Sequence, residues 1–340
     1  MTHDHAVALT LLPTMPRVGL TDRLRQNDPT LIELARPLLE QARELRSAVE
    51  RHGILTVSWN QPDYPQHLLT IADAPPALWY RGHLASIRRP GVALVGARAA
   101  SSVGLEAARR LAAGVAARGL TVVSGLARGV DSEAHAGALT TGRTAAVLGG
   151  GVDEIYPPEH ADLAALIARE GIVLSEFPPG TPALPFHFPL RNRIISGLSR
   201  IVVVVEAAEK SGSLITAACA LEQGREVMAV PGSVLHGRNR GGHALIRDGA
   251  KIVETADDIV GEVMGSPVLA PLGAIDTTLA ETSTSGKDLL SVMEPGTSCG
   301  VDELAARSGL DGPGVLRALT DLELAGLVRR VAAGCYSRVS

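Results

Sequence analysis

Short runs of valine and isoleucine alternate with alanine-rich stretches of helical spacing through residues 91–260. A glycine-rich turn follows each run. Strands that are apolar on both faces and alternate with helices are typical of a parallel sheet covered by helices on both sides. We therefore expect an α/β fold with a Rossmann-like, doubly wound, mainly parallel sheet. The predicted strands are residues 92–96, 121–125, 144–150, 171–176, 201–206 and 226–232.

The pattern changes on either side of this region. The N-terminal part is rich in Leu, Ala, Arg and Glu at helical spacing with a break at Pro37, and it predicts a small helical domain. Near the other end, a polar stretch without a period is typical of a flexible linker. The tail has the order helix, turn, helix and hairpin, which is the outline of a winged helix. The predicted parts are 1–55 (helical), 56–262 (Rossmann-like), 263–286 (linker) and 287–340 (winged helix).

Composition restricts the class of partner. Hydrophobic residues make up 46% of the chain and charged residues 20%, which is typical of a globular protein. The net charge of −4 gives no overall attraction for a polyanion. Residues 81–260 hold 19 Lys and Arg against 17 Asp and Glu, whereas the remainder holds 13 against 19. A nucleic-acid partner would therefore need a local site in the middle of the chain.

The cysteines and the longest apolar runs bear on the compartment. Cys219, Cys299 and Cys335 match no metal-ligand spacing and suit the reduced thiols of a cytoplasmic protein. No apolar run approaches the roughly 20 residues that span a membrane. We expect a cytoplasmic protein that needs no metal and has no membrane partner.

The turn after the first predicted strand is a candidate anion site, because ligands of doubly wound sheets bind at the carboxyl ends of the strands. It contains Gly96, Arg98, Ser101 and Ser102 ahead of a helix, whose first N–H groups favour an anion. The turn matches neither the dinucleotide fingerprint nor the P-loop, so no nucleotide cofactor is indicated. The alternative is a tight turn that binds nothing.

The turn after the second strand is also rich in glycine, with Gly125, Arg128 and Gly129. Asp131, Glu133 and His135 follow, and they allow an acid–base or metal cluster. Capping and local hydrogen bonding are the favoured interpretation, because Asp131 and His135 are only i, i+4 neighbours and lack a third ligand.

Arginines surround a predicted helix that begins at Pro189. Its apolar stripe of Leu190, Ile194 and Leu198 should face the sheet. We expect Arg191 and Asn192 in the exposed first turn and Arg193 on another side of the helix.

All three phenylalanines of the chain lie just before this helix or at its start. Rings beside arginines can stack on unpaired bases. Phe186 is the candidate for exposure, whereas Phe177 and Phe188 are expected to fill the core. A further helix start, after the fifth strand, carries Lys210, Ser211, Gly212 and Ser213.

These segments occur in an order that resembles the DNA-processing protein A (DprA/Smf) family over about residues 60–260, and the tail resembles the winged helix of many members. The segments are VGARAASSVG, SGLARGVDSEAHAGAL, AVLGGGVDEIYPPEH, LSEFPPG, FPLRNRIISGLS, EKSGSLITAACALEQGREVMAVPG and LIRDGAK. The resemblance implies a non-enzymatic homodimer without cofactor that binds single-stranded DNA. It also implies protection of incoming DNA and loading of the RecA recombinase onto it in natural transformation.

Carried over residue by residue, the resemblance implies a DNA site and a dimer interface. The DNA site comprises Gly96, Arg98, Ser101, Ser102, Gly125, Arg128, Gly129, Phe186, Arg191, Asn192, Arg193, Lys210, Ser211, Gly212 and Ser213; the interface includes Leu221 and Ile246. Two positions depart from the family pattern. Ala97 replaces a usual serine, which removes one hydroxyl, and Pro158 replaces a lysine that some members offer to DNA.

Two other functions are weighed against this one. A Rossmann-like nucleotide phosphoribohydrolase would need an acid three residues after Thr216, where this chain has Cys219. A duplex-binding winged helix would need a basic recognition helix, but Arg317 is accompanied there by Asp321 and Glu323. Both alternatives are less well supported than binding of single-stranded DNA.

Overall fold

The structure is a computed structural model. It describes residues 1–265, 289, 292–293, 298–324, 328–332 and 335–338. The chain divides into two compact units, Met1–Ser266 and Pro267–Ser340, which are described separately. The predicted linker lies outside the described residues except for residues 263–265, which are the end of a helix.

In the described part of the first unit, the central element is a nine-stranded sheet of order β1-β2-β6-β5-β4-β3-β7-β8-β9. The two pairs β1–β2 and β2–β6 are antiparallel, and all other neighbours are parallel. The predicted doubly wound, mainly parallel sheet is thus confirmed. The strands are β1 (Leu55–Ser58), β2 (Ala77–Gly82), β3 (Gly91–Val95), β4 (Val122–Ser124), β5 (Thr144–Val147), β6 (Ile172–Ser175), β7 (Ser199–Val204), β8 (Glu226–Ala229) and β9 (Lys251–Ile252).

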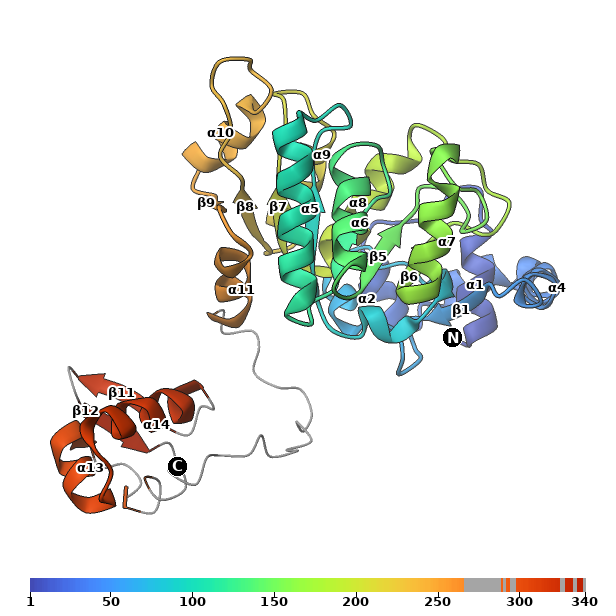
Figure 1. Ribbon diagram of the computed structural model, residues 1–340. Helices are drawn as coiled ribbons and strands as arrows, with labels where there is room; N and C mark the ends of the chain where they lie inside the picture. The colour runs from blue at the N-terminus through green and yellow to red at the C-terminus, as the bar shows by residue number, and fades with distance from the viewer. Residues whose placement is uncertain (266–288, 290–291, 294–297, 325–327, 333–334, 339–340) are drawn as a thin grey trace. The chain divides into compact units, whose positions relative to one another are not determined.

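Helices cover both faces of this sheet (Figure 1). One face carries α5 (Ser102–Ala117), α6 (Val130–Leu139), α7 (Ala161–Glu170) and α11 (Ala256–Gly265); the other carries α8 (His187–Gly197) and α9 (Ser213–Glu222).

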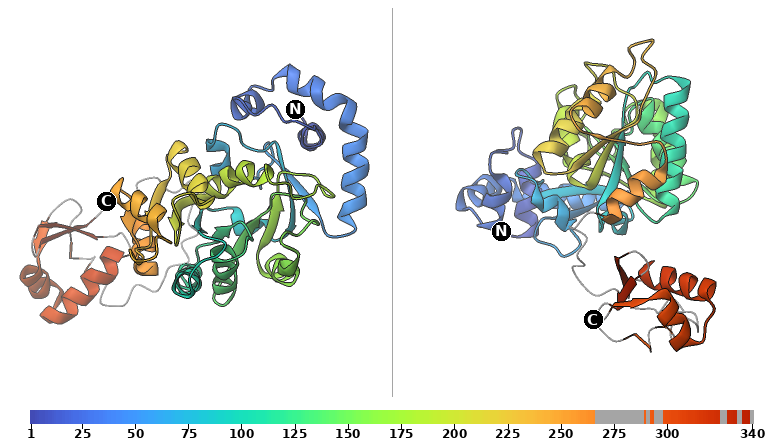
Figure 2. Two further views of the ribbon diagram at one scale, coloured as in Figure 1. Left: turned by 90° about the horizontal axis from the view of Figure 1, so that it is seen from above. Right: turned by 90° about the vertical axis from the view of Figure 1, so that its left-hand side faces the viewer.

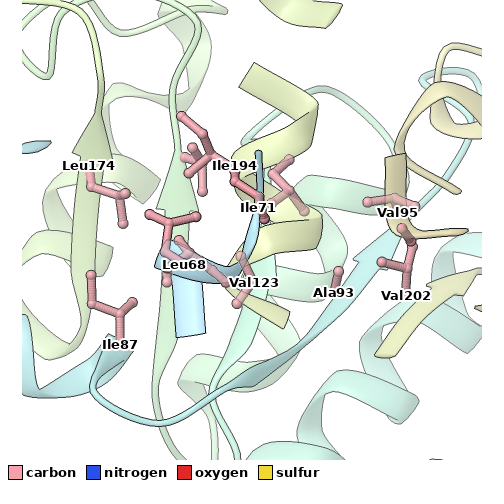
Figure 3. Packing of buried hydrophobic residues seen from close by; sticks show 14 of the residues in the cluster. Leu68, Ile71, Ile87, Ala93, Val95, Val123, Leu174, Ile194 and Val202 are labelled. Carbon is pink, nitrogen blue, oxygen red and sulfur yellow. The ribbon is translucent and has the colours of Figure 1, made fainter. Parts of the chain in front are cut away.

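The alternation of side chains along β3 explains the two covered faces. Val92 and Leu94 pack with α5 and α6, whereas Ala93 and Val95 pack with α8 and α9. Figure 3 shows the second of these clusters, where Ile194 of α8 lies near Leu68 and Ile71 of the segment before β2. A strand buried on both sides needs apolar residues at every position, which is why these strands were recognisable.

The N-terminal helices pack at the β1–β2 edge of the sheet (Figure 2). They are α1 (His3–Thr10), α2 (Leu20–Arg25), α3 (Pro29–Ala35) and α4 (Leu39–Glu50), with a 3₁₀ turn at Arg36–Leu38. The predicted break at Pro37 is therefore confirmed. Trp79 of β2 is fully buried against α1 and donates its Nε1–H to Thr10 Oγ1 at 3.1 Å. These helices share a core with the sheet. A separate domain at residues 1–55 stays a prediction.

The second unit is small, and its described residues have the predicted winged-helix order. The elements are β10 (Ser298–Gly300), α13 (Val301–Ser308), α14 (Gly312–Leu324), β11 (Val328–Ala332) and β12 (Cys335–Arg338), with strand order β10-β12-β11. Leu304, Leu319, Val328 and Tyr336 are buried together in its core. The winged helix is confirmed, with β10 as an unpredicted third strand.

The sheet order places a topological switch between β3 and β7. The chain continues from β3 to β4 on one side and from β7 to β8 on the other. Crossovers on opposite faces leave a crevice outside the carboxyl ends of the two central strands, and this is where doubly wound sheets bind ligands. Of the helices in the described residues, none is both long enough and apolar enough to span a membrane.

Candidate nucleic-acid interface

A cleft of about 600 Å³ lies at this switch point. The loop after β3 and the loop that leads from β7 into α9 form two of its walls, and the first turns of α8 contribute a third. Eight of the predicted DNA-site residues line it, namely Gly96, Arg98, Arg191, Asn192, Lys210, Ser211, Gly212 and Ser213. Segments far apart in the sequence are thus brought to one place.

Arg98 stands over an aromatic ring at the cleft. Its Cζ lies 5.3 Å from the ring centroid of Phe188, and the ring of Tyr156 lies 5.6 Å from that of Phe188. Among the described residues no carboxylate forms an ion pair with Arg98, and its side chain is exposed. An exposed guanidinium held on a ring can bind a phosphate while the rings offer faces to bases.

Phe188 was expected in the core, and this expectation is wrong. Phe188 is only half-buried and lines the cleft. His187 takes the inner position, stacks on Phe177 with ring centroids 4.1 Å apart, and bonds through Nδ1 to the carbonyl oxygen of Gly149 at 3.0 Å. Sequence reasoning also missed Tyr156. The available signal was its position in the glycine-rich loop after β5, at the same edge of the sheet.

Arg191 is buried at the bottom of the cleft, although an exposed first turn was predicted for it and for Asn192. Their exposed fractions are 4% and 8%. Arg191 Nη1 donates to the carbonyl oxygen of Gly125 at 2.7 Å and to that of Val147. A Cβ on Gly125 would lie 2.2 Å from Nη1, so only glycine leaves room for the guanidinium. The prediction failed because the loop after β4 covers the start of α8.

The buried guanidinium keeps its charge. Burial lowers the pKa of Arg191 to about 10, with a smaller opposing effect from the carboxylate of Asp131. The side chain is therefore still protonated at neutral pH. Asp131 Oδ2 accepts the backbone N–H groups of Gly125 and Ala127 at 3.1 and 3.3 Å, so this carboxylate holds the loop in shape. The predicted local hydrogen bonding is thus present, but Asp131 does not cap α6, whose N-cap residue is Gly129.

His135 does not form an acid–base pair with Asp131. It is fully buried, and its Nδ1 lies 2.7 Å from Thr144 Oγ1. Burial lowers its pKa to about 3, so the ring is neutral. Within the described residues no group of His, Cys, Asp and Glu is placed to hold a metal ion.

The loop before α9 supplies a second exposed cation. Lys210 is exposed, and no carboxylate of the described residues forms an ion pair with it. Ser211 Oγ and Ser213 Oγ lie 2.8 Å apart at the start of the helix, where both line the cleft. Lys210 and Arg98 come from the loops after neighbouring strands, β7 and β3.

Arg128 lies beside the cleft, in a recess that it shares with Gly125, Arg98 and Phe188. Its Nε lies 2.5 Å from Glu159 Oε1, and both side chains are about half exposed. This carboxylate offsets part of the charge that Arg128 would present to a phosphate. Gly129 has φ +80°, and a Cβ there would lie 2.3 Å from the carbonyl oxygen of Ala97, so this glycine serves the packing of two loops.

The two predicted serines of the first loop lie outside the cleft lining. The backbone N–H and the hydroxyl of Ser101 donate to Glu206 at 2.9 and 2.5 Å. The carboxylate of Glu206, two residues after β7, thus occupies the N-terminus of α5, where a phosphate was expected. Ser102 lines a separate groove with Val103 and Val230. The sequence could not reveal the contact between Ser101 and Glu206, because it depends on β3 and β7 being neighbours in the sheet.

Arg193 lies away from the cleft. Its Nε donates to Asp73 Oδ2 at 2.7 Å and its Nη2 to Glu176 Oε2 at 2.8 Å, and Arg17 also donates to Glu176 at 2.9 Å. The guanidinium is therefore neutralised by the buried Glu176 and the half-buried Asp73, and its predicted contact with DNA has no support from its position.

Phe186 lies next to the cleft without lining it. It is 63% exposed, as predicted, and packs edge-on to His187 with ring centroids 4.5 Å apart. Its neighbour Pro185 does line the cleft. A base leaving the cleft on this side could reach the ring of Phe186.

The predicted dimer residues lie on two helices of the first unit. Leu221 of α9 is 60% exposed. Ile246 of α10 (Arg240–Arg247) is half-buried.

Comparison with known proteins agrees with this architecture. A family profile described as DNA recombination-mediator protein A matches residues 55–264, and one described as the DprA winged helix domain matches residues 276–334. DNA processing protein DprA of Streptococcus pneumoniae is 47% identical over 200 residues, which cover 58% of this chain and 71% of the relative. Protein Smf of Escherichia coli is 42% identical over 282 residues, which cover 80% and 74%.

Solved structures show the same relationship. The X-ray structure of DprA from Streptococcus pneumoniae aligns with a TM-score of 0.65 at 35% identity, over 77% of this chain and 98% of that chain. DprA from Helicobacter pylori, studied for its single-stranded DNA binding mode, aligns with a TM-score of 0.57 at 26% identity, over 62% and 96%. The matched profile, the relatives and the fold agree, and this chain belongs to the DNA processing protein A (DprA/Smf) family.

Proposed function

We propose that this protein binds single-stranded DNA in the cleft at the β3–β7 switch point. The observation that carries the proposal is the pair of exposed cations, Arg98 and Lys210, that flank one cleft beside the rings of Phe188 and Tyr156. Cations track the phosphates of an unpaired strand, and rings stack on its bases. Arg191 also lies at the bottom of the cleft, where the carboxylate of Asp131 offsets part of its charge.

The dimensions of the cleft favour a single strand over a duplex. A volume of about 600 Å³ is in the range of a small-ligand site, so the cleft holds only a short piece of a strand. A duplex keeps its bases paired inside the helix, so its bases cannot reach the ring of Phe188. The single-stranded DNA binding mode studied for the Helicobacter pylori relative supports the same choice.

Binding of a fluorescent oligo-dT strand and of a duplex of equal length tests this proposal on the full chain. The single strand is expected to bind roughly tenfold more tightly or better, because only its bases can stack. The logarithm of its binding constant should fall with log[salt] by about 0.7 per phosphate neutralised. Equal or tighter binding of the duplex would contradict the proposal.

We further propose that the bound strand is protected and passed to a RecA recombinase, in natural transformation and recombination. The description of the matched family as a recombination mediator supports this role. A mediator needs to bind and release DNA, which an open, solvent-exposed cleft allows without any catalytic group. We accordingly propose no enzymatic activity.

A homodimer through α9 and α10 is part of the proposal. Leu221 exposes an apolar side chain near the end of α9, and an exposed leucine of this size favours burial against a second copy.

Leu221→Arg is expected to give a folded monomer, since a buried unpaired charge would oppose association. Light scattering measures the mass. A dimeric mass for the variant would exclude this interface, and Val18→Arg, at a 93% exposed position, is the matched control.

A further inference from the structure

The loop between β8 and α10, residues 231–239, exposes an apolar tip. Val234 and Leu235 are adjacent and are 79% and 81% exposed. In Figures 1 and 2 the loop before α10 projects from the body of the first unit. Large aliphatic side chains at a loop tip stay in contact with water unless a partner covers them.

The base of this loop is held firmly. Asn239 is 2% exposed, accepts the N–H of Ala207 at 3.0 Å and donates to the carbonyl oxygen of Val230 at 2.9 Å. His243 Nε2 lies 3.0 Å from the carbonyl oxygen of Gly232. The tip is therefore carried on a fixed base.

The loop is joined directly to the cleft. Arg238 Nη1 donates to the carbonyl oxygen of Ala99, next to Arg98, at 3.1 Å. On the other side, the N–H of Gly241 donates to Ala207 at 2.9 Å, close to Ala208 of the cleft lining. A strand that leaves the cleft past Arg98 would thus meet the 231–239 loop.

The charge around the tip suits a polyanion. Residues 231–247 contain three Arg, two His and no Asp or Glu. Arg238 and Arg240 are exposed on either side of Asn239.

We propose that the 231–239 loop and Arg240, the first residue of α10, form a second contact for the same DNA strand. Val234 and Leu235 pack against unstacked bases, and Arg240 binds phosphate. In kinked duplexes, leucine and isoleucine side chains insert between base steps, so aliphatic groups can pack against the faces of bases. The inference rests on the proposed function of the cleft and extends its DNA track by the nucleotides that follow.

DNA strands of two lengths distinguish a contact at the loop from a contact in the cleft. The full chain and its Val234→Ser/Leu235→Ser variant are titrated with dT strands of about 6 and about 16 nucleotides. The variant should bind the long strand about fivefold more weakly, which is the lower end of the range for a base stacked on an aromatic ring, and the short strand unchanged. Val18→Ser, at another exposed apolar position, is the control and should bind both as wild type does.

Each other outcome has a defined meaning. Unchanged binding of the long strand overturns the inference. A loss of dimeric mass in light scattering also overturns it and assigns the tip to an interface between copies. Equal weakening for both lengths means that the loop supports the cleft and is no separate contact. Failure of the wild type to bind either strand refutes the proposed function itself.

The phosphate contact has an independent readout. Arg240→Ala should reduce the slope of log binding constant against log[salt] for the long strand by about 0.7, because one phosphate loses its partner. An unchanged slope would remove Arg240 from the contact.

Discussion

Arg193→Ala is expected to lower the free energy of unfolding of the first unit by about 3–5 kcal/mol. The guanidinium is 7% exposed and forms ion pairs with Glu176, which is 6% exposed, and with Asp73. Without it, Glu176 keeps only Arg17, whose side chain is 21% exposed, and a buried carboxylate would be poorly compensated. Urea denaturation of the full chain, followed by circular dichroism, measures the loss.

Two further variants separate the ion pair from simple loss of packing. Arg17→Ala removes the outer partner of the same carboxylate. The variant should lose much less free energy of unfolding, about 1 kcal/mol, because water partly screens the charge of Arg17. Arg193→Met with Glu176→Gln removes both charges and should recover part of the stability. An Arg193→Ala protein as stable as wild type would show that the ion pairs contribute nothing.

Arg98→Ala combined with Lys210→Ala is expected to weaken oligo-dT binding at least about tenfold, since a hydrogen bond to a charged group contributes roughly 1.5–3 kcal/mol. Both side chains are exposed. Neither forms an ion pair with a carboxylate of the described residues, so the double variant leaves no buried carboxylate without a partner. The salt slope should fall by about 1.4, that is, by about 0.7 for each lost cation. Fluorescence anisotropy measures both quantities.

The matched control removes two exposed arginines at the amino ends of the strands, opposite the cleft. Arg89 precedes β3 and Arg143 precedes β5, so both lie at the amino ends of strands. Arg89→Ala with Arg143→Ala changes the net charge equally and should leave oligo-dT binding nearly unchanged. Equal weakening by the two double variants would show that binding follows total charge and not the cleft.

The fold was predictable where burial makes the sequence uniform. The strands β3 to β8 are apolar on both faces, and their repeated turns and helices indicated the parallel order. The strand β9 was missed because Lys251 and Ile252 are both exposed, and β1 because Leu55 and Thr56 resemble the polar connector around them. Short edge strands have no such signal.

The sequence predicted which loops form the site, but not how the side chains of α8 are oriented in it. Parallel strands present their carboxyl ends at one edge, so Arg98 and Lys210 could be expected to meet. The orientation of Arg191 and Arg193 could not be predicted, because it depends on which carboxylates and carbonyl groups surround α8. Glu176 and Asp73 neutralise one arginine, whereas the carbonyl oxygens of Gly125 and Val147 hold the other.

Ultraviolet cross-linking of an oligo-dT strand to the full chain, with mass spectrometry of the linked peptides, tests the central claim most directly. The cleft predicts links at Phe188 and Tyr156, whose rings would lie against the bases. Links confined to the groove beside Val103, or to residues 298–338, would contradict it.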